Sequence, residues 1–178
     1  MGVGLGVMAV GLIVMAAMDM GARGLIPQGE PMPRVAGVLA DGSEVLYMEG
    51  DTGETVLLLD FWTTWCPACV RSMPSLERLA TDLGPEGFEL LTVNLDEARN
   101  REEQGRLVRS FLEERELDLP VLLDDGRLQH AFKAYTLPTI YLVGRDGSIV
   151  RGWSGAASER VLRREIRRAL EAGADPHR

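Results

Sequence analysis

The chain contains two cysteines, Cys66 and Cys69, which are separated by only two residues. They directly follow residues 56–62, an apolar run typical of a buried strand, and Pro67 favours the first turn of a helix. A thiol at the start of a helix lies among unpaired backbone N–H groups and at the positive end of the helix dipole, and both stabilise its thiolate. Because thiolates attack disulfides, and because the two thiols can close a small disulfide ring, this pair indicates thiol–disulfide exchange.

The same pair has two structural interpretations, and the rest of the sequence favours neither. A structural zinc site needs four ligands, and beyond the cysteines the chain offers only His130 and His177. A purely structural disulfide across so short a loop would add little stability through chain entropy. With 178 residues, of which 46% are apolar, the chain can bury a core without a cross-link.

The chain is acidic, with a formal net charge of −8 at pH 7. Nucleic-acid binding depends on Lys and Arg side chains at the phosphates, so the composition argues against a nucleic-acid partner. The one basic cluster lies in residues 160–168, where arginines flank an apolar stripe that includes Leu162 and Ile166. That pattern is typical of the solvated face of an amphipathic helix, although a membrane-surface or partner role stays open.

The N-terminal part of the chain has the composition of an export segment. Residues 2–18 carry no charge, and a polar, proline-rich passage follows at residues 27–33. An apolar stretch of this length is short for a membrane span and also fits a cleaved signal segment, whereas the glycine-rich start disfavours a buried core helix. We therefore expect a membrane anchor or signal segment over residues 1–26, a linker over residues 27–34, and an extracytoplasmic location in the periplasm or at the outer face of the cell membrane.

Beyond the linker, strand and helix patterns alternate over residues 35–172. Strands are predicted at residues 35–39, 44–48, 55–62, 88–95, 121–123, 139–143 and 148–153, with hairpin turns at Asp41-Gly42 and at residues 145–147. Helices are predicted at residues 67–83, 100–115 and 127–135, and in a last helix that Ser158 caps. This alternation predicts a single α/β domain with a mixed sheet, followed by a disordered tail at residues 173–178.

The sequence resembles the thioredoxin fold at several motifs. They are Leu59-Asp60-Phe61-Trp62, Trp65-Cys66-Pro67-Ala68-Cys69, Pro74 five residues later, and Leu137-Pro138-Thr139. A helix-and-strand insert over residues 100–123, the N-terminal hairpin and the apolar leader make the chain more similar to the membrane-anchored TlpA/ResA-type thioredoxins. The resemblance covers residues 35–170 and implies a thioredoxin-like three-layer α/β fold around a mixed central sheet.

The resemblance also implies roles for the motif residues. Cys66 would be the attacking thiol and Cys69 the buried resolving thiol. Pro138 would be a cis-proline that faces the dithiol and blocks metal capture, and its neighbouring backbone would pair with an extended substrate segment. The substrate-binding residues would be Trp65, Pro67, Leu137 and Pro138. No cofactor and no metal are implied.

Asp60 matches the buried aspartate of cytoplasmic-type thioredoxins. A carboxylate between Leu59 and Phe61 in a core strand is desolvated, so we expect its pKa to rise and the group to accept the Cys69 proton, directly or through water. The alternative is a carboxylate that backbone donors satisfy at the strand end.

Two departures from the TlpA/ResA pattern limit what can be transferred. Ser72 stands three residues after the second cysteine, where those proteins usually carry a glutamate near the active site. The lysine that pairs with the buried aspartate in thioredoxins is also missing, because the corresponding strand reads Thr92-Val93-Asn94-Leu95-Asp96. Without that partner the pKa of Asp60 is expected to rise further.

The resemblance implies an extracytoplasmic thiol–disulfide oxidoreductase that acts as a reductant, for example in cytochrome c maturation. Its partners would be exported thiol proteins, including apocytochrome c, and a membrane electron-donor thiol protein. Tens of millivolts separate a reductant from an oxidant, so the direction of electron flow stays open. Two other classes stay open as well: a peroxiredoxin-like peroxidase, and a copper-carrying module that would need His130 beside the cysteine pair.

Overall fold

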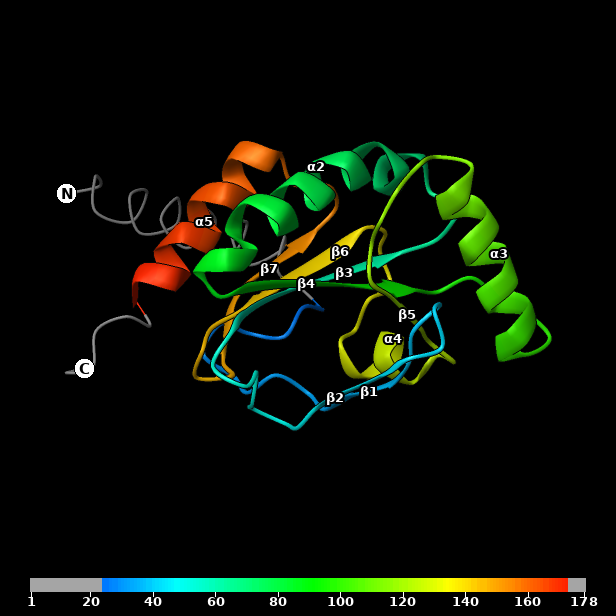
Figure 1. Cartoon of the computed structure of the whole chain (residues 1–178). Helices are drawn as coiled ribbons and strands as arrows, with labels where there is room; N and C mark the ends of the chain where they lie inside the picture. The colour runs from blue at the N-terminus through cyan, green and yellow to red at the C-terminus, as the bar shows by residue number, and fades with distance from the viewer. Residues whose placement is uncertain (1–23, 173–178) are drawn as a thin grey trace, which may run out of the picture.

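The computed structural model describes residues 24–172 and shows a five-stranded central sheet with helices on both faces (Figure 1). The strands are β1 (Val35–Val38), β2 (Glu44–Tyr47), β3 (Val56–Trp62), β4 (Phe88–Asn94), β5 (Val121–Leu123), β6 (Thr139–Val143) and β7 (Ile149–Ser154). The helices are α2 (Pro67–Leu83), the short 3-10 helix η1 (Gly84–Glu86), α3 (Arg101–Glu113), α4 (Arg127–Ala131) and α5 (Glu159–Ala172).

The central sheet is mixed and has the strand order β5-β4-β3-β6-β7. β3 runs parallel to β4 and antiparallel to β6, while β5 is parallel to β4 and β7 is antiparallel to β6. In Figure 1, α2 and α5 cover one face of the sheet, and α4 and the β1–β2 hairpin lie at the other face. The mixed sheet and the elements on its two faces form three layers, which confirms the predicted α/β architecture. The antiparallel pairs β1–β2 and β6–β7 confirm both predicted hairpins.

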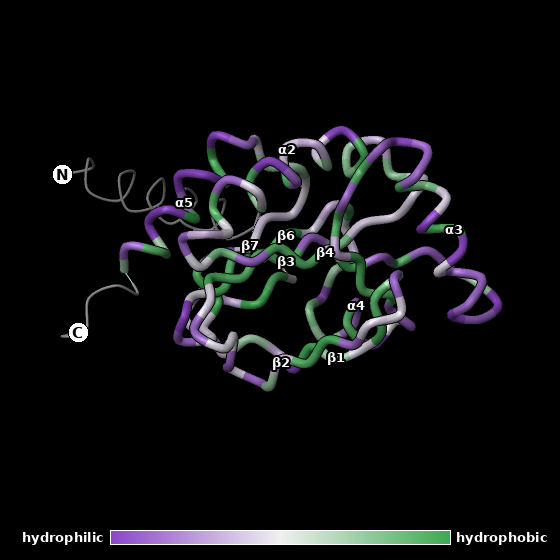
Figure 2. The backbone as a smooth tube through the Cα atoms, viewed as in Figure 1, coloured by the Kyte–Doolittle hydropathy of each residue, from purple (hydrophilic) through white to green (hydrophobic). Residues whose placement is uncertain are grey.

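β3 lies at the centre of the core, and each of its residues is buried. Because side chains alternate along a strand, Leu58 and Trp62 belong to the apolar cluster under α2 and α5, whereas Leu59 and Phe61 belong to a second cluster that includes Phe132. Figure 2 shows hydrophobic residues concentrated in the central strands, while the outer helices mix hydrophobic and hydrophilic residues. Packing on both faces explains why every residue of this strand except Asp60 is apolar.

α2 begins where the sequence predicts it, a few residues after β3. Cys66 is the N-cap residue and has an extended backbone. Pro67 occupies the first turn, where a backbone N–H would have no partner within the helix, so proline costs no hydrogen bond there. The helix continues through Pro74 to Leu83. Its buried side chains are Cys69, Met73, Leu76, Leu79 and Leu83, which cover the sheet.

The predicted helix over residues 127–135 was too long. α4 ends at Ala131, and Lys133 has a left-handed backbone with φ of 53°. Phe132 and Ala134 are fully buried on either side of the exposed Lys133. A continuing helix would point these two side chains about 200° apart, so the chain turns out of the helix to bury both. The short helix η1 was not predicted.

Residues 27–34, which the sequence analysis expects to be a linker, lie against the start of β7. The Met32 N–H donates a hydrogen bond of 2.9 Å to the Gly147 carbonyl, and the Met32 side chain is fully buried. Gly147 has φ of +73°, and a side chain at this position would collide with the backbone of Gly50. The packed part of the chain therefore begins before Val35.

The structure describes neither residues 1–23 nor residues 173–178. Most of the expected anchor or signal segment, and the expected disordered tail, lie outside the described residues. Within residues 24–172, no helix is both long enough and apolar enough to cross a membrane.

Candidate active site

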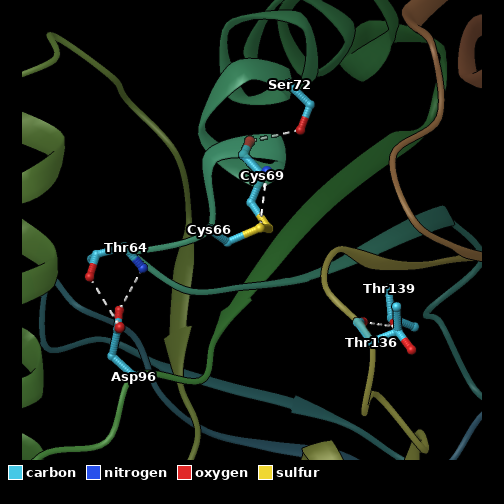
Figure 3. The surroundings of a disulfide bond; sticks show 7 residues. All are labelled: Thr64, Cys66, Cys69, Ser72, Asp96, Thr136 and Thr139. Carbon is cyan, nitrogen blue, oxygen red and sulfur yellow. Dashed lines mark hydrogen bonds between the residues drawn. A yellow bond between two sulfur atoms is a disulfide. The ribbon is translucent and has the colours of Figure 1, made fainter.

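Cys66 and Cys69 form a disulfide at the N-terminus of α2, with their Cα atoms 5.3 Å apart (Figure 3). Cys66 is 6% exposed, whereas Cys69 is fully buried. The Cys66 sulfur accepts a hydrogen bond of 3.2 Å from the Cys69 N–H. A thiolate that forms at Cys66 on reduction would therefore have a backbone donor and the helix dipole to stabilise it, and it is the sulfur nearer the surface.

Two further sequence-predicted residues flank Cys66 and are exposed to solvent. Trp65 is 71% exposed, and Pro67 is exposed on the other side of Cys66. Both border an open cleft that begins at Cys66. Both side chains are therefore accessible from solvent beside Cys66.

The Leu137–Pro138 peptide bond is cis, as predicted. Pro138 is buried, and its carbonyl accepts a hydrogen bond of 2.8 Å from the Gly155 N–H. Leu137 is half-buried and borders the same cleft as Cys66. Within residues 24–172, no backbone hydrogen bond uses the N–H or the carbonyl of Leu137. This backbone is free to pair with an extended chain.

Asp60 lies in the middle of β3, opposite Thr92 of β4 and Ile140 of β6. Its side chain is fully buried, and neither carboxylate oxygen has a hydrogen-bond partner among the residues that the structure describes. Burial raises the pKa of Asp60 from 3.8 to about 7. The alternative in which backbone donors satisfy this carboxylate at the strand end is therefore wrong.

The strand alternation places Asp60 on the same face of the sheet as Leu58 and Trp62. Those two side chains pack in one cluster with Cys69 and Cys66. The carboxyl group with the raised pKa thus faces the layer that holds the buried thiol.

Asp96, a further residue of the site that was not predicted from the sequence, anchors the loop of residues 63–66 before the disulfide (Figure 3). One of its carboxylate oxygens accepts hydrogen bonds from the Thr64 N–H at 2.9 Å and from the Asn94 side-chain amide at 2.7 Å. Its other oxygen accepts the Thr64 hydroxyl at 3.1 Å. Asp96 follows the buried strand β4, which runs parallel to β3, so both strands end at the edge of the sheet that carries the disulfide. The place of Asp96 directly after a buried strand was the sequence feature that could have identified it as a residue of this site.

Ser72 provides no carboxylate near the disulfide. Its hydroxyl donates a hydrogen bond of 2.8 Å to the Cys69 carbonyl, inside the first turns of α2 (Figure 3). The position that usually carries a glutamate in TlpA/ResA-type proteins thus holds a neutral group that bonds to its own helix.

His130 is exposed on α4, and its Nδ1 lies 2.8 Å from the Tyr135 hydroxyl. Across residues 24–172, the structure brings together no group of three or more His, Cys, Asp or Glu side chains that could hold a metal ion.

Comparisons with known proteins agree with this site. The profile of the AhpC/TSA family matches residues 29–151. The thiol-disulfide oxidoreductase ResA of Halalkalibacterium halodurans is 31% identical over 107 residues, which are 60% of this chain and 57% of that protein. The sporulation thiol-disulfide oxidoreductase A of Bacillus subtilis is 30% identical over 107 residues, 60% of this chain and 63% of that protein. The chain therefore spans about six tenths of the length of these curated relatives.

A solved structure shows the same fold over most of this chain. It is a Chlorobium tepidum protein assigned as thiol:disulfide interchange protein DsbE, with a TM-score of 0.71 and 26% sequence identity. The similarity covers 82% of this chain and 99% of that chain. Together with the ResA relatives, it confirms the thioredoxin-like fold and the resemblance to ResA-type proteins.

Proposed function

Since the chain belongs to the AhpC/TSA family and is similar to thiol-disulfide oxidoreductases, we propose that it exchanges disulfides with protein substrates through Cys66 and Cys69. The observation that carries this proposal is the disulfide at the N-terminus of α2, in which Cys66 lines an open cleft and Cys69 is fully buried. A disulfide with a purely structural role would not need one of its cysteines to line a cleft.

In the reducing direction, the Cys66 thiolate attacks one sulfur of a substrate disulfide. A Cys66–substrate bond forms, the substrate disulfide breaks, and the second substrate sulfur leaves as a thiolate that takes up a proton. Cys69 then loses its proton and attacks the Cys66 sulfur, which releases the first substrate sulfur as a thiolate. The substrate gains two electrons, and the protein ends with the Cys66–Cys69 disulfide.

Asp60 is the proposed acceptor of the Cys69 proton. A pKa of about 7 gives a carboxyl group that is partly ionised near neutral pH and can both take and return a proton. The transfer is direct or passes through water in this layer. The unpaired carboxylate oxygens support this role because no hydrogen-bond partner in the described chain competes for them.

The substrate contacts proposed from the sequence are Trp65, Pro67, Leu137 and Pro138. The unpaired N–H and carbonyl of Leu137 would bond to the backbone of an extended substrate segment. Trp65 and Pro67 would cover that segment on the disulfide side, where both are exposed. Pro138 would hold the Leu137 backbone in place.

We further propose that the protein works outside the cytoplasm, attached to the membrane or exported through residues 1–26. Its substrates would be exported thiol proteins, including apocytochrome c, and a membrane thiol protein would return it to the reduced state. The relatives named as thiol-disulfide oxidoreductases and the uncharged stretch at residues 2–18 support this proposal. In that compartment a dithiol needs a dedicated electron donor, because the cytoplasmic reducing systems do not reach it.

The proposal is tested with the reduced full chain and a protein disulfide such as that of insulin. We expect two substrate thiols to appear for each pair of thiols that the protein loses, and continued turnover when dithiothreitol is supplied. Hydrogen peroxide and copper(I) are the comparison reagents. Faster oxidation by peroxide than by the protein disulfide, or stoichiometric retention of copper by the reduced protein, would overturn the proposal in favour of a peroxidase or a copper carrier.

A further inference from the structure

The cleft beside Cys66 has a volume of about 1500 Å³. Pockets that bind small molecules usually measure roughly 300–1,000 Å³ and enclose most of the ligand. This cleft is larger and open. It extends from the loop before the disulfide (residues 63–66) to helix α3. Its size and openness fit a stretch of polypeptide better than a small molecule.

Large apolar side chains are exposed at few places in residues 24–172, and most of these places border this cleft. Trp65 is 71% exposed, Tyr135 is 64% exposed and Leu107 of α3 is 43% exposed, and all three border it. Leu46 and Met48 are also exposed but do not border it. Three separate segments thus contribute an exposed apolar side chain to one cleft whose lining also holds charged residues such as Arg101 and Asp125. This combination indicates a polypeptide partner that carries a large apolar side chain.

Hydrogen bonds hold the α3 side of the cleft to the disulfide side. The Gln104 side-chain amide of α3 donates to the carbonyls of Asn94 at 3.1 Å and of Asp124 at 3.2 Å. Asn94 in turn bonds to Asp96, which accepts the Thr64 N–H next to Trp65 (Figure 3). Gln104 and Asn94 are buried, so water does not compete strongly for these bonds.

Leu107 lies three residues after Gln104 on α3. The network therefore fixes the position of Leu107 relative to the loop of residues 63–66. The cleft is therefore formed before a substrate arrives. Binding in a preformed cleft avoids the cost of ordering its walls.

We infer that this cleft binds an extended segment of the protein substrate, and that Leu107 and Tyr135 select segments with a large apolar side chain near the reacting cysteine. The cleft continues directly from Cys66, so the polypeptide that carries the attacked disulfide is the occupant that must lie there. Exported proteins that have not yet folded present such apolar side chains. This inference rests on the proposed disulfide exchange and adds to it the class of polypeptide that is preferred.

The test compares two cyclic peptide disulfides that differ only in one residue next to a cysteine, which is phenylalanine in one peptide and serine in the other. Leu107→Gln keeps a long side chain with good helix propensity, so the helix stays intact. For reduction of the phenylalanine peptide by the full chain, we expect this variant to raise KM about 10-fold with kcat nearly unchanged, because it removes part of one apolar contact. Turnover of 2-hydroxyethyl disulfide, which is too small to reach α3, should not change.

Leu46→Gln is the matched control, because Leu46 is 58% exposed on β2 but lies outside the cleft. It should behave as the parent with both peptides. Equal KM values for Leu107→Gln and Leu46→Gln, or equal use of the two peptides by the parent, would overturn the inference while turnover of 2-hydroxyethyl disulfide leaves the proposed function standing. If the parent reduces neither the peptides nor 2-hydroxyethyl disulfide, the proposed function fails first and the inference fails with it.

Discussion

Cys66→Ser is expected to reduce disulfide exchange to the background rate, because the sulfur that forms the mixed disulfide is then missing. Cys69→Ala is expected to leave the first step intact and to block the second. The Cys69→Ala variant should therefore accumulate mixed disulfides between Cys66 and its substrates. Non-reducing electrophoresis and mass spectrometry of the full chain after mixing with a protein disulfide would measure both outcomes.

The two cysteines differ because of their burial. Cys66 is 6% exposed and lines the cleft, whereas Cys69 is fully buried, so a substrate disulfide meets the Cys66 sulfur first. Ser72→Ala is a suitable control, since within residues 24–172 its hydroxyl bonds to no group other than the Cys69 carbonyl and its loss should not affect either step. Accumulation of mixed disulfides in Cys66→Ser, but not in Cys69→Ala, would reverse the roles assigned to the two thiols.

Asp60→Asn is expected to slow the breakdown of the mixed disulfide by about 100-fold, the lower end of what a positioned general base contributes. Alkylation of reduced Cys66 by iodoacetamide should change little, because that step depends on the thiolate at the helix N-terminus rather than on the Asp60 carboxylate. Stopped-flow measurement of mixed-disulfide decay, alongside alkylation rates, separates the two steps. Equal decay rates in the variant and the parent across the pH range would leave Asp60 as a structural carboxyl group only.

The same substitution is expected to change the dependence of stability on pH. The pKa of Asp60 is 3.8 in the unfolded chain and about 7 in the folded one, so the folded state binds the proton more tightly. Stability therefore falls as pH rises from about 4 to about 7, and the full penalty of about 4 kcal/mol is present above that range. Asp60→Asn lacks this penalty.

Urea denaturation of the oxidised protein at pH 4 and pH 8 would measure the effect. At pH 4 the Asp60 carboxyl is neutral in the folded state and only partly ionised in the unfolded state, so most of the penalty is absent and the variant and parent should have similar free energies of unfolding. At pH 8 the variant should be more stable by up to about 4 kcal/mol. A variant that is less stable than the parent at pH 8 would show that the carboxylate has a stabilising partner.

The sequence was sufficient to predict the part of the site that is local in the chain. The apolar run of β3, Pro67 at the first turn of α2 and the two cysteines lie within a few residues of one another, so strand, helix start and dithiol follow from short-range patterns. The buried Asp60 was also predictable, because its neighbours on both sides are core residues.

The remaining features depend on contacts between distant segments. Asp96 bonds to Thr64 across a separation of 32 residues. Its place after a buried strand indicates the edge of the sheet where it lies, but nothing near either residue in the sequence indicates that the two are partners. The sequence pattern around Leu107 predicts an amphipathic helix and nothing more specific. Leu107 lines the cleft because α3 packs beside β5, and that packing is not visible in the local sequence. The end of α4 was mispredicted for a similar reason, since burial of both Phe132 and Ala134 overrides the helical pattern.

The most direct test of disulfide exchange is a redox titration of the full chain against glutathione, with the state of Cys66 and Cys69 determined by alkylation and mass spectrometry. The proposed function predicts one transition between the Cys66–Cys69 disulfide and the dithiol, with the two-electron response of about 30 mV for each tenfold change in the equilibrium constant. A pair that stays a disulfide at every accessible potential, or a stable glutathione adduct on Cys66 beside a free Cys69 thiol, would contradict it.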